Sequence, residues 1–133
     1  MLYEIEIRTN REFEIIDITS KVQKIVEESD IQEGIAVIFT KHTTTALIVN
    51  ENERGLLSDI GLLLESSAPR GKGYLHDRID SNAHAHLRAI LLNSSVVIPI
   101  KDKKLELGTW QSILFVELDG PRARKVVVKL CSC

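Results

Sequence analysis

The chain of 133 residues corresponds to about one domain, because domains average roughly 150 residues. Hydrophobic residues make up 44% and charged residues 27%, as in an ordinary globular domain. The 17 Lys and Arg and the 19 Asp and Glu residues give a net charge of −2. That balance argues against a nucleic-acid-binding protein, which usually has a basic excess. No apolar run approaches the ~20 residues of a membrane-spanning helix. We therefore predict one domain over residues 1–133 that binds neither nucleic acid nor a membrane.

The two ends of the chain indicate its compartment. Residues 1–8 are acidic and alternate in polarity, which is typical of a strand and not of a signal peptide. The only cysteines, Cys131 and Cys133, lie together at the C-terminal end, so no disulfide framework can form. We therefore expect a reducing, cytoplasmic location, and we interpret the two thiols as incidental rather than as metal or redox groups.

Apolar patterns predict about seven strands. In residues 3–8 apolar and charged side chains alternate, which indicates one buried face. Residues 35–40 form a continuous apolar run, which is typical of a strand buried on both faces. The Asp-Gly pair in residues 119–122 predicts a turn between the last two strands. The other predicted strands cover residues 13–18, 46–49, 96–100, 113–118 and 126–130.

Changes of period predict three helices and one long loop. Residues 20–23 have the Ser-x-x-Gln pattern of a capping box before a short apolar stripe. Apolar residues within positions 50–64 recur at helical spacing. A third stripe over residues 83–91 follows Ser81, a suitable N-cap residue. Residues 65–80 have no period and contain Gly, Pro and Ser, so we predict a surface loop whose length is typical of a functional or disordered segment.

These elements predict a single α+β domain with mainly antiparallel strands. Several of the strands are apolar on both faces, yet only three helices are available to cover them. Uncovered apolar sheet requires another subunit against it, so we predict an oligomer.

Four histidines are candidate metal ligands. Neutral imidazole is the commonest side-chain ligand, and three such ligands with an open position suit zinc or a similar ion. On a helix, His84 and His86 point about 200° apart, so at most one of them joins a given site. His86 shares a helix face with Asn82 and is the better candidate, whereas His84 is expected to be solvated. The others are His42 and His76, and spacing alone leaves open that all are ordinary surface or core residues.

Other polar groups suit the binding of an anion. Thr43, Thr44 and Thr45 offer hydroxyls and backbone amides that can hold a phosphate or carboxylate, although a β-branched strand start also explains them. Glu51 ends a strand that begins near the first histidine and can act as a ligand or general base, or simply favour a helix dipole. Residues 70–73, Arg-Gly-Lys-Gly, are either a lid over an anion or a plain flexible loop.

Two further residues stand out. Trp110 is the only tryptophan and lies among small and polar residues, so it can anchor a subunit interface or wall a pocket, with core packing as the default. Glu117 lies within an apolar strand, where a carboxylate is costly unless it is paired. We expect Arg122 or Arg124 to be its partner, in a structural pair rather than a catalytic one.

Five segments together resemble the YjbQ family, which is also called uncharacterised protein family 47 or the secondary thiamine-phosphate synthase family. The resemblance runs in order over nearly the whole chain. The segments are His-Thr-Thr-Thr-Ala at 42–46, Asn-Glu at 50–51, Asn-Ala-His-Ala-His-Leu at 82–87, Gly-Thr-Trp-Gln at 108–111 and Glu-Leu-Asp-Gly-Pro-Arg at 117–122.

The resemblance implies a compact α+β fold and a homotrimer. It also implies a site in which His42, His76 and His86 gather around a divalent metal, with zinc as the expected ion. The C-terminal Cys-Ser-Cys tail lies outside the family pattern. The polar residues that would complete the pocket are Glu51, Asn82, Thr109 and Gln111.

The activity attached to the family is that of a thiamine-phosphate synthase, which joins a hydroxymethylpyrimidine pyrophosphate to a thiazole phosphate and releases pyrophosphate. The word "secondary" implies a side activity. We therefore predict a metal-binding enzyme acting on a small phosphorylated molecule, with Glu51 as a base or water-orienting group. Alternatives are a non-catalytic anion- or small-molecule-binding module, a metal-dependent hydrolase, and a structural trimer without a ligand. The predicted phosphate-binding residues are Thr43, Thr44, Thr45 and Lys72.

Overall fold

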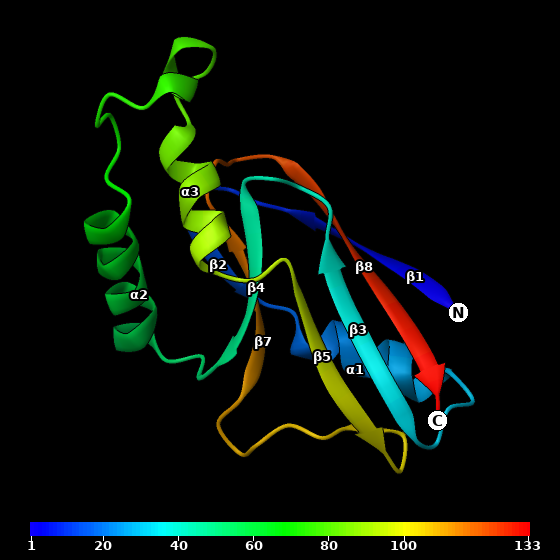
Figure 1. The fold of residues 1–133 in the computed structure, drawn as a ribbon. Coiled ribbons are helices and arrows are strands. Elements are labelled where there is room, and N and C mark those ends of the chain that lie inside the picture. Colours follow the sequence, from blue (N-terminus) through cyan, green and yellow to red (C-terminus); the bar gives the residue numbers. More distant parts are fainter.

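Two antiparallel sheets make up most of the computed structural model, which describes residues 1–133 (Figure 1). The larger sheet has the strand order β1-β8-β3-β5-β6, and the smaller has the order β2-β7-β4. Every pairing is antiparallel. There are eight strands instead of about seven, because a two-residue strand, β6, follows β5. The strands are β1 (Leu2–Arg8), β2 (Glu14–Asp17), β3 (Gly34–Thr40), β4 (Thr45–Asn50), β5 (Ser95–Lys101), β6 (Lys104–Leu105), β7 (Ser112–Glu117) and β8 (Ala123–Ser132).

Three helices connect these strands, as predicted, and complete an α+β fold. They are α1 (Thr19–Glu28), α2 (Arg54–Ser67) and α3 (Ala83–Leu91). The predicted loop at 65–80 is shorter than expected, because α2 runs to Ser67 and a 3-10 turn, η1 (Leu75–Arg78), precedes α3. None of the helices has the length and apolar character that crossing a lipid bilayer requires.

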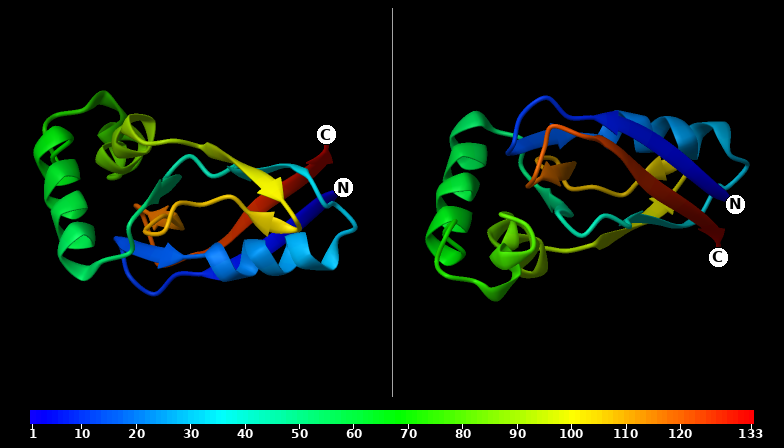
Figure 2. Two further views of the ribbon diagram at one scale, coloured as in Figure 1. Left: turned by 90° about the horizontal axis from the view of Figure 1, so that it is seen from below. Right: turned by 90° about the horizontal axis from the view of Figure 1, so that it is seen from above.

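The two sheets pack face to face, and their inner faces form the main core. Ile38 and Val128 of the larger sheet belong to one buried cluster with Leu47 and Phe115 of the smaller sheet and with Val22 of α1. The opposite face of the smaller sheet packs against α2 and α3 through a second cluster. Figure 2 shows α2 and α3 on one side of the strands, whereas α1 runs alongside the strands. The smaller sheet is therefore covered on both faces.

The larger sheet is covered on its inner face only. In β3, Ala36 and Ile38 point inward and are fully buried, whereas Phe39 is 39% exposed. Val97, whose neighbour in the ladder is Val37, is 54% exposed on the same outer face. The prediction that residues 35–40 are buried on both faces is therefore wrong within this chain, because no helix packs on the outer face. The sequence predicted apolar strand surface that the three helices cannot cover, and that surface lies on this outer face.

Two predicted helix caps are replaced by other contacts. At α1, the carboxylate of Asp17 accepts from the Thr19 N–H at 2.9 Å, so the Ser-x-x-Gln box is not used. Gln23 instead accepts from the Leu105 N–H at 3.0 Å, which ties α1 to β6. At α3, the Asp77 carboxylate accepts from the Ala83 N–H at 3.0 Å, in place of a cap from the residue at 81. In both helices a residue outside the predicted motif supplies the carboxylate that satisfies a free N–H group at the helix start.

Candidate functional site

A buried ion pair lies at the turn that joins β7 to β8. Glu117, the last residue of β7, is fully buried. Arg124 donates through Nε to Glu117 Oε1 at 2.8 Å and through Nη2 to Oε2 at 2.5 Å. Such a bidentate pair offsets the cost of burying both charges. Arg124 is therefore confirmed as the partner of Glu117, whereas Arg122 binds the carboxylate of Asp119.

The ion pair also connects β1 to the turn between β3 and β4. Thr9 Oγ1 donates to Glu117 Oε1 at 2.8 Å, and the Asp119 N–H donates to Oε2 at 3.0 Å. Arg124 Nη2 donates to Thr44 Oγ1 at 2.9 Å. Burial raises the pKa of Glu117, but the hydrogen bonds and charge of Arg124 outweigh it and hold the pKa below its ordinary value. An ionised Glu117 therefore holds three segments together.

The contact between Arg124 and the β3–β4 turn was not predicted, although the sequence contains a signal for it. Val126, Val128 and Leu130 alternate along β8 and point into the core. Arg124 occupies the same inward phase of this strand. A charged side chain in the inward phase needs partners on neighbouring segments, so this phase alone indicates that Arg124 organises the surrounding structure.

His42 follows β3 and is held by the backbone of β8. The Lys125 N–H donates to His42 Nε2 at 3.0 Å. Partial burial and the positive charge of Arg124 lower the pKa of His42, so the ring is neutral. Since Nε2 accepts a hydrogen bond in the neutral ring, Nδ1 carries the proton. In this conformation His42 therefore presents an N–H donor, which suits an anion better than a cation.

A cavity of about 460 Å³ opens beside His42, where α3 meets the end of β3. We call it the histidine pocket. His86 of α3 forms part of its wall, so two of the three histidines predicted as ligands line it. A cavity of this size is in the range that holds a small ligand. Its lining residues include Phe39, Lys41, His42, Thr43, Thr45, His86 and Ile90.

His76 of η1 and His86 of α3 are in direct contact. Their ring centroids are 4.6 Å apart, and the rings meet edge to face at 77°. Both line a second cavity, of about 330 Å³. His76 Nε2 is buried and has no hydrogen-bond partner. A buried ring nitrogen without a partner fits a bound cation, so this pair suits two of the nitrogen ligands that a zinc ion takes.

The three histidines do not form one ligand set within the chain. No group of three or more His, Cys, Asp or Glu side chains is placed to hold a metal ion. His86 lies between the other two, because it lines the histidine pocket with His42 and the second cavity with His76. A metal held by His76 and His86 therefore lacks a third ligand from this chain.

Asn82 directly precedes α3 and Ala83, which lines the second cavity. Its Nδ2 donates to the Asp119 carboxylate at 2.9 Å, and its Oδ1 is buried without a partner. This contact links α3 to the turn after β7. Asn82 therefore combines a structural bond with a buried acceptor that no group of the chain satisfies.

The three threonines after His42 have different surroundings. Thr44 accepts from Arg124, and the hydroxyl of Thr45 lies 2.7 Å from that of Thr40. Both are buried, whereas Thr43 is exposed. Thr43 is therefore the one with a hydroxyl free for a phosphate, and the other two shape the turn.

His84 is buried, so the prediction that it is solvated is wrong. Its side chain is 2% exposed, and Nε2 lies 3.9 Å from Glu12 Oε1. Burial, with the positive charges of Arg70 and Arg88, lowers the pKa of His84. The face of α3 opposite His86 packs inward against the loop after α2, which helical spacing alone does not reveal.

The glycine-rich stretch at 70–73 is anchored by an ion pair at its first residue. Arg70 forms an ion pair with Glu12 in the turn between β1 and β2. Gly71 and Gly73 have φ angles of 71° and 79°, which favour glycine. Lys72, the predicted phosphate ligand, is exposed between them.

Glu51, Thr109 and Gln111 lie at the opposite end of the smaller sheet. Thr45, beside His42, starts β4, and Glu51 follows its last residue. Six strand residues span roughly 17 Å at about 3.3 Å per residue. Asn50 pairs with Ser112, which directly follows Gln111, so these three polar residues share one end of the sheet (Figure 1). We call this the tryptophan end, and the residues around His42, His76 and His86 the histidine end.

Trp110 is 72% exposed at the tryptophan end, so the default prediction of core packing is wrong. The turn around it is held by Gln111, whose Oε1 accepts from the Gly108 N–H at 2.9 Å. The side chain of Gln111 thus orders the turn, and the indole of Trp110 does not pack in the core.

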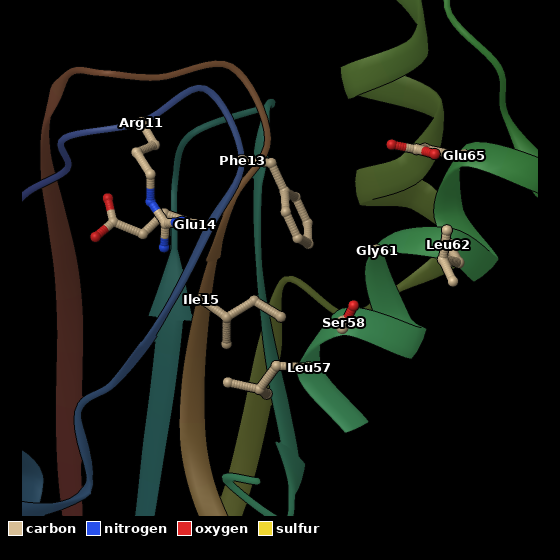
Figure 3. Close-up of a pocket in the computed structure, with 9 residues that line it drawn as sticks. All are labelled: Arg11, Phe13, Glu14, Ile15, Leu57, Ser58, Gly61, Leu62 and Glu65. Atoms are coloured by element: carbon tan, nitrogen blue, oxygen red, sulfur yellow. The ribbon is translucent and has the colours of Figure 1, made fainter. Parts of the chain in front are cut away.

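A third cavity, of about 380 Å³, lies between β2 and α2 (Figure 3). Phe13 and Ile15 face Leu57 across it, and a carboxylate lies at each side, Glu14 and Glu65. No histidine and no predicted site residue lines it, so it is separate from the candidate site.

Comparison with known proteins identifies the family. Residues 3–133 match the family model described as "UPF0047 protein YjbQ-like". The chain belongs to the YjbQ family. A UPF0047 protein of Archaeoglobus fulgidus is 56% identical over 126 residues, covering 95% of this chain and 98% of the relative. The UPF0047 protein YugU of Bacillus subtilis is 33% identical over 131 residues, covering 98% of each chain.

Solved structures of similar sequence have the same fold. A YbjQ-like protein of unknown function from Sulfolobus solfataricus P2 superposes with a TM-score of 0.97 at 43% identity, covering 100% of this chain and 97% of that one. A hypothetical protein from Aeropyrum pernix K1 gives a TM-score of 0.96 at 37% identity, covering 100% and 99%. The resemblance found in the sequence motifs is thereby confirmed for family and fold.

Proposed function

We propose that this YjbQ-family chain is a metal-binding enzyme with thiamine-phosphate synthase-like activity toward small phosphorylated molecules. The observation that carries the proposal is the contact between His76 and His86, in which His76 Nε2 is buried without a partner. Buried polar atoms are nearly always satisfied, so an orphaned ring nitrogen beside a second imidazole favours a cation-binding role for the two rings. Several reactions suit such a site. Among them, the synthase-like reaction is the one that the resemblance to the YjbQ family implies.

His76 and His86 would hold the divalent ion, for which zinc is the best match to nitrogen ligands. A bound cation would supply Lewis-acid stabilisation of phosphate oxygens. His42 has a different role in this proposal, because its proton lies on Nδ1 while Nε2 accepts from the Lys125 N–H. We assign it to donating a hydrogen bond to a substrate phosphate, with the exposed Thr43 hydroxyl beside it in the histidine pocket.

The synthase-like reaction balances without another reactant. The thiazole nitrogen donates its lone pair to the methylene carbon of the pyrimidine, and the bond from that carbon to the pyrophosphate oxygen breaks. The electron pair leaves with pyrophosphate, whose charge must be neutralised. Lys41, exposed at the rim of the histidine pocket, suits this task, and the exposed Lys72 of the glycine-rich stretch is a second candidate.

Metal uptake gives the first test. We expect zinc titrated into chelator-treated protein to bind with one equivalent per chain, and His76→Ala and His86→Ala to weaken binding at least tenfold. His84→Gln is the matched control, because it removes an imidazole from the opposite face of α3. Unchanged zinc affinity in both alanine variants would remove the metal from the proposal.

Turnover gives the second test. Wild-type protein with zinc is incubated with hydroxymethylpyrimidine pyrophosphate and thiazole phosphate, and thiamine phosphate and pyrophosphate are quantified. Stoichiometric amounts of both products that disappear in His86→Ala support the synthase-like activity. Pyrophosphate or phosphate release without thiamine phosphate would identify a hydrolase instead. Tight phosphate binding without any turnover or zinc dependence would identify an anion-binding module.

A further inference from the structure

The third cavity, between β2 and α2, adjoins a fourth cavity of about 490 Å³. Phe13 and Glu65 line both of them, and we call the two together the α2 groove. In the third cavity, Phe13 and Ile15 face Leu57 (Figure 3). An apolar part beside a charged part is the usual make-up of a small-molecule site. The charged part is the fourth cavity, whose lining includes Glu12, Glu65, Arg70 and Arg88.

Two of these four charges are already matched within the chain. Arg70 forms an ion pair with Glu12, so the two side chains neutralise each other. Glu65 and Arg88 take part in no ion pair. The fourth cavity is therefore left with one carboxylate and one guanidinium that lack a counter-charge, although both line the same space.

The guanidinium of Arg88 is oriented but only partly satisfied. Its Nε donates to Ala68 O at 3.0 Å, just after the end of α2, whereas its Nη groups have no acceptor in the chain. Arg88 is half-buried. This burial and the positive charge of Arg70 lower the pKa of Arg88, while the negative charge of Glu65 acts in the opposite direction. A partly desolvated guanidinium with free Nη groups is well suited to a carboxylate, which accepts two hydrogen bonds from it.

Glu65 suits a positively charged group of a ligand. It lies in the last turn of α2, where the helix dipole disfavours a carboxylate and favours a cation. An ammonium group at this position is attracted both by Glu65 and by the end of the helix. The charge of Glu65 acts on Arg88 although the two form no ion pair, so space remains between them for a ligand that carries both charges.

The apolar part of the groove lies along the same face of α2. Leu57, Gly61 and Glu65 are spaced four residues apart and therefore lie on one side of the helix. A Cβ on Gly61 would lie 3.2 Å from Phe13 Cε2, so the glycine lets the aromatic ring approach α2 closely. Phe13 and Leu57 thus form an apolar wall next to the free carboxylate, where an apolar substituent of the ligand fits.

We propose that the α2 groove binds a free α-amino acid with an apolar side chain. The α-carboxylate accepts hydrogen bonds from the Nη groups of Arg88, the α-ammonium group donates to Glu65, and the side chain lies against Phe13 and Leu57. A residue within a peptide lacks both charges, and a simple organic acid or amine leaves one of the two protein charges unmatched. The groove contains no residue of the histidine end, so this binding is independent of the proposed function.

Three ligands with the same apolar body test the proposal. Leucine has both charged groups, isocaproate lacks the ammonium group, and isoamylamine lacks the carboxylate. Binding to the full-length protein is measured by ligand-observed NMR titration, with EDTA present so that no metal ion can chelate the amino acid. We expect saturable binding of leucine in the millimolar range or tighter, and binding of both analogues weaker by about tenfold or more. No saturable leucine binding in that range, or an analogue that binds as tightly as leucine, overturns the proposal.

Charge variants test which group each residue binds. Glu65→Gln should weaken leucine binding about tenfold and leave isocaproate binding unchanged, which abolishes the preference for the amino acid. Arg88→Gln should abolish the preference for leucine over isoamylamine in the same way. A purely structural role for either residue would weaken all three ligands alike, and that result overturns its assignment.

Glu14→Gln is the matched control for Glu65→Gln. Glu14 lies on the opposite side of the third cavity, and its carboxylate accepts from the Asn10 N–H at 2.8 Å, which an amide oxygen can also do. Leucine affinity should therefore be unchanged in Glu14→Gln. An equal loss of affinity in the two variants would show that Glu65 does not bind the ammonium group.

Two neighbouring leucines locate the apolar part. Leu62 and Leu63 are 61% and 62% exposed, but only Leu62 lines the groove. Leu62→Ser should weaken leucine binding several-fold, whereas Leu63→Ser should not change it. His86→Ala should keep full leucine affinity, because it alters only the histidine end. Equal effects of the two serine variants, or loss of leucine binding in His86→Ala, would place the amino acid elsewhere and overturn the proposal.

Discussion

The histidine end and the tryptophan end use their polar residues in opposite ways. At the histidine end, Glu117 receives hydrogen bonds from Arg124, Thr9 and a backbone N–H, and it is fully buried. At the tryptophan end, Gln111 makes one hydrogen bond within its own exposed turn. A densely bonded, buried network holds side chains in place, whereas an exposed turn can exchange its contacts with water for contacts with a partner. The histidine end thus holds its side chains in a bonded network, whereas the tryptophan end is ordered only by contacts within its own turn.

The largest expected effect tests the buried network. Arg124→Met leaves Glu117 buried without its counter-charge, and we expect it to lower the free energy of unfolding by about 3–5 kcal/mol. Urea denaturation measures the change. Glu51→Gln, at the tryptophan end, serves as the comparison and should change stability by less than about 0.5 kcal/mol. A similar loss in both variants would contradict the contrast between the two ends.

Two glycines give a closely matched comparison, with a smaller expected loss of stability. A Cβ on Gly120 would lie 2.4 Å from Arg11 O and 2.7 Å from Glu117 Cγ, so Gly120→Ala forces the turn beside the ion pair apart. We expect a loss of about 1–3 kcal/mol, as for overpacked sites. A Cβ on Gly108 meets only the flexible side chain of Gln111, with Oε1 nearest at 3.4 Å, so Gly108→Ala should be nearly neutral. Thermal denaturation of both variants checks the difference.

The pH dependence of stability tests the burial of His84. Its pKa is lowered in the folded protein, so the unfolded chain, with an ordinary pKa of about 6.5, binds the proton more readily. The contribution of neutral, buried His84 to the free energy of unfolding is complete above that ordinary pKa. It is lost as the pH falls through the depressed pKa of the folded state. His84→Gln should therefore reduce the difference in melting temperature between about pH 7.5 and about pH 5. The lowered pKa of His42 leaves a residual dependence, and an unchanged difference would contradict the burial of His84.

The smallest expected effect concerns the turn at the tryptophan end. Gln111→Ala removes the acceptor for the Gly108 N–H and should lower stability by about 0.5–1.5 kcal/mol, the usual net value of one hydrogen bond. Gln111→Glu keeps an acceptor oxygen and should preserve most of that stability. Differential scanning calorimetry separates the two, and equal losses would show that the side-chain acceptor does not hold the turn.

Local patterns along the chain determined the strands, the three helices and the family. Alternation placed Ile5 and Ile7 in the core, because a strand presents successive side chains to opposite faces. The cost of a buried carboxylate predicted a partner for Glu117, and Arg124 fills that role. Helical spacing placed Asn82 and His86 toward one region of α3. These properties depend on neighbours within a few residues or on a general rule of burial, so they can be derived without knowing how distant segments meet.

Only the tertiary structure decided which of the chemically promising residues come together. His76 and His86 meet because η1 folds back on the start of α3, and His42 loses its Nε2 acceptor to a backbone N–H of β8. Glu51, Thr109 and Gln111 are carried to the far end because β4 and β7 run antiparallel over their whole length. The burial of His84 against a loop from another part of the chain had no local signal at all. Long-range packing selects which surfaces touch, and a repeat of two or 3.6 residues describes only the face of a single element.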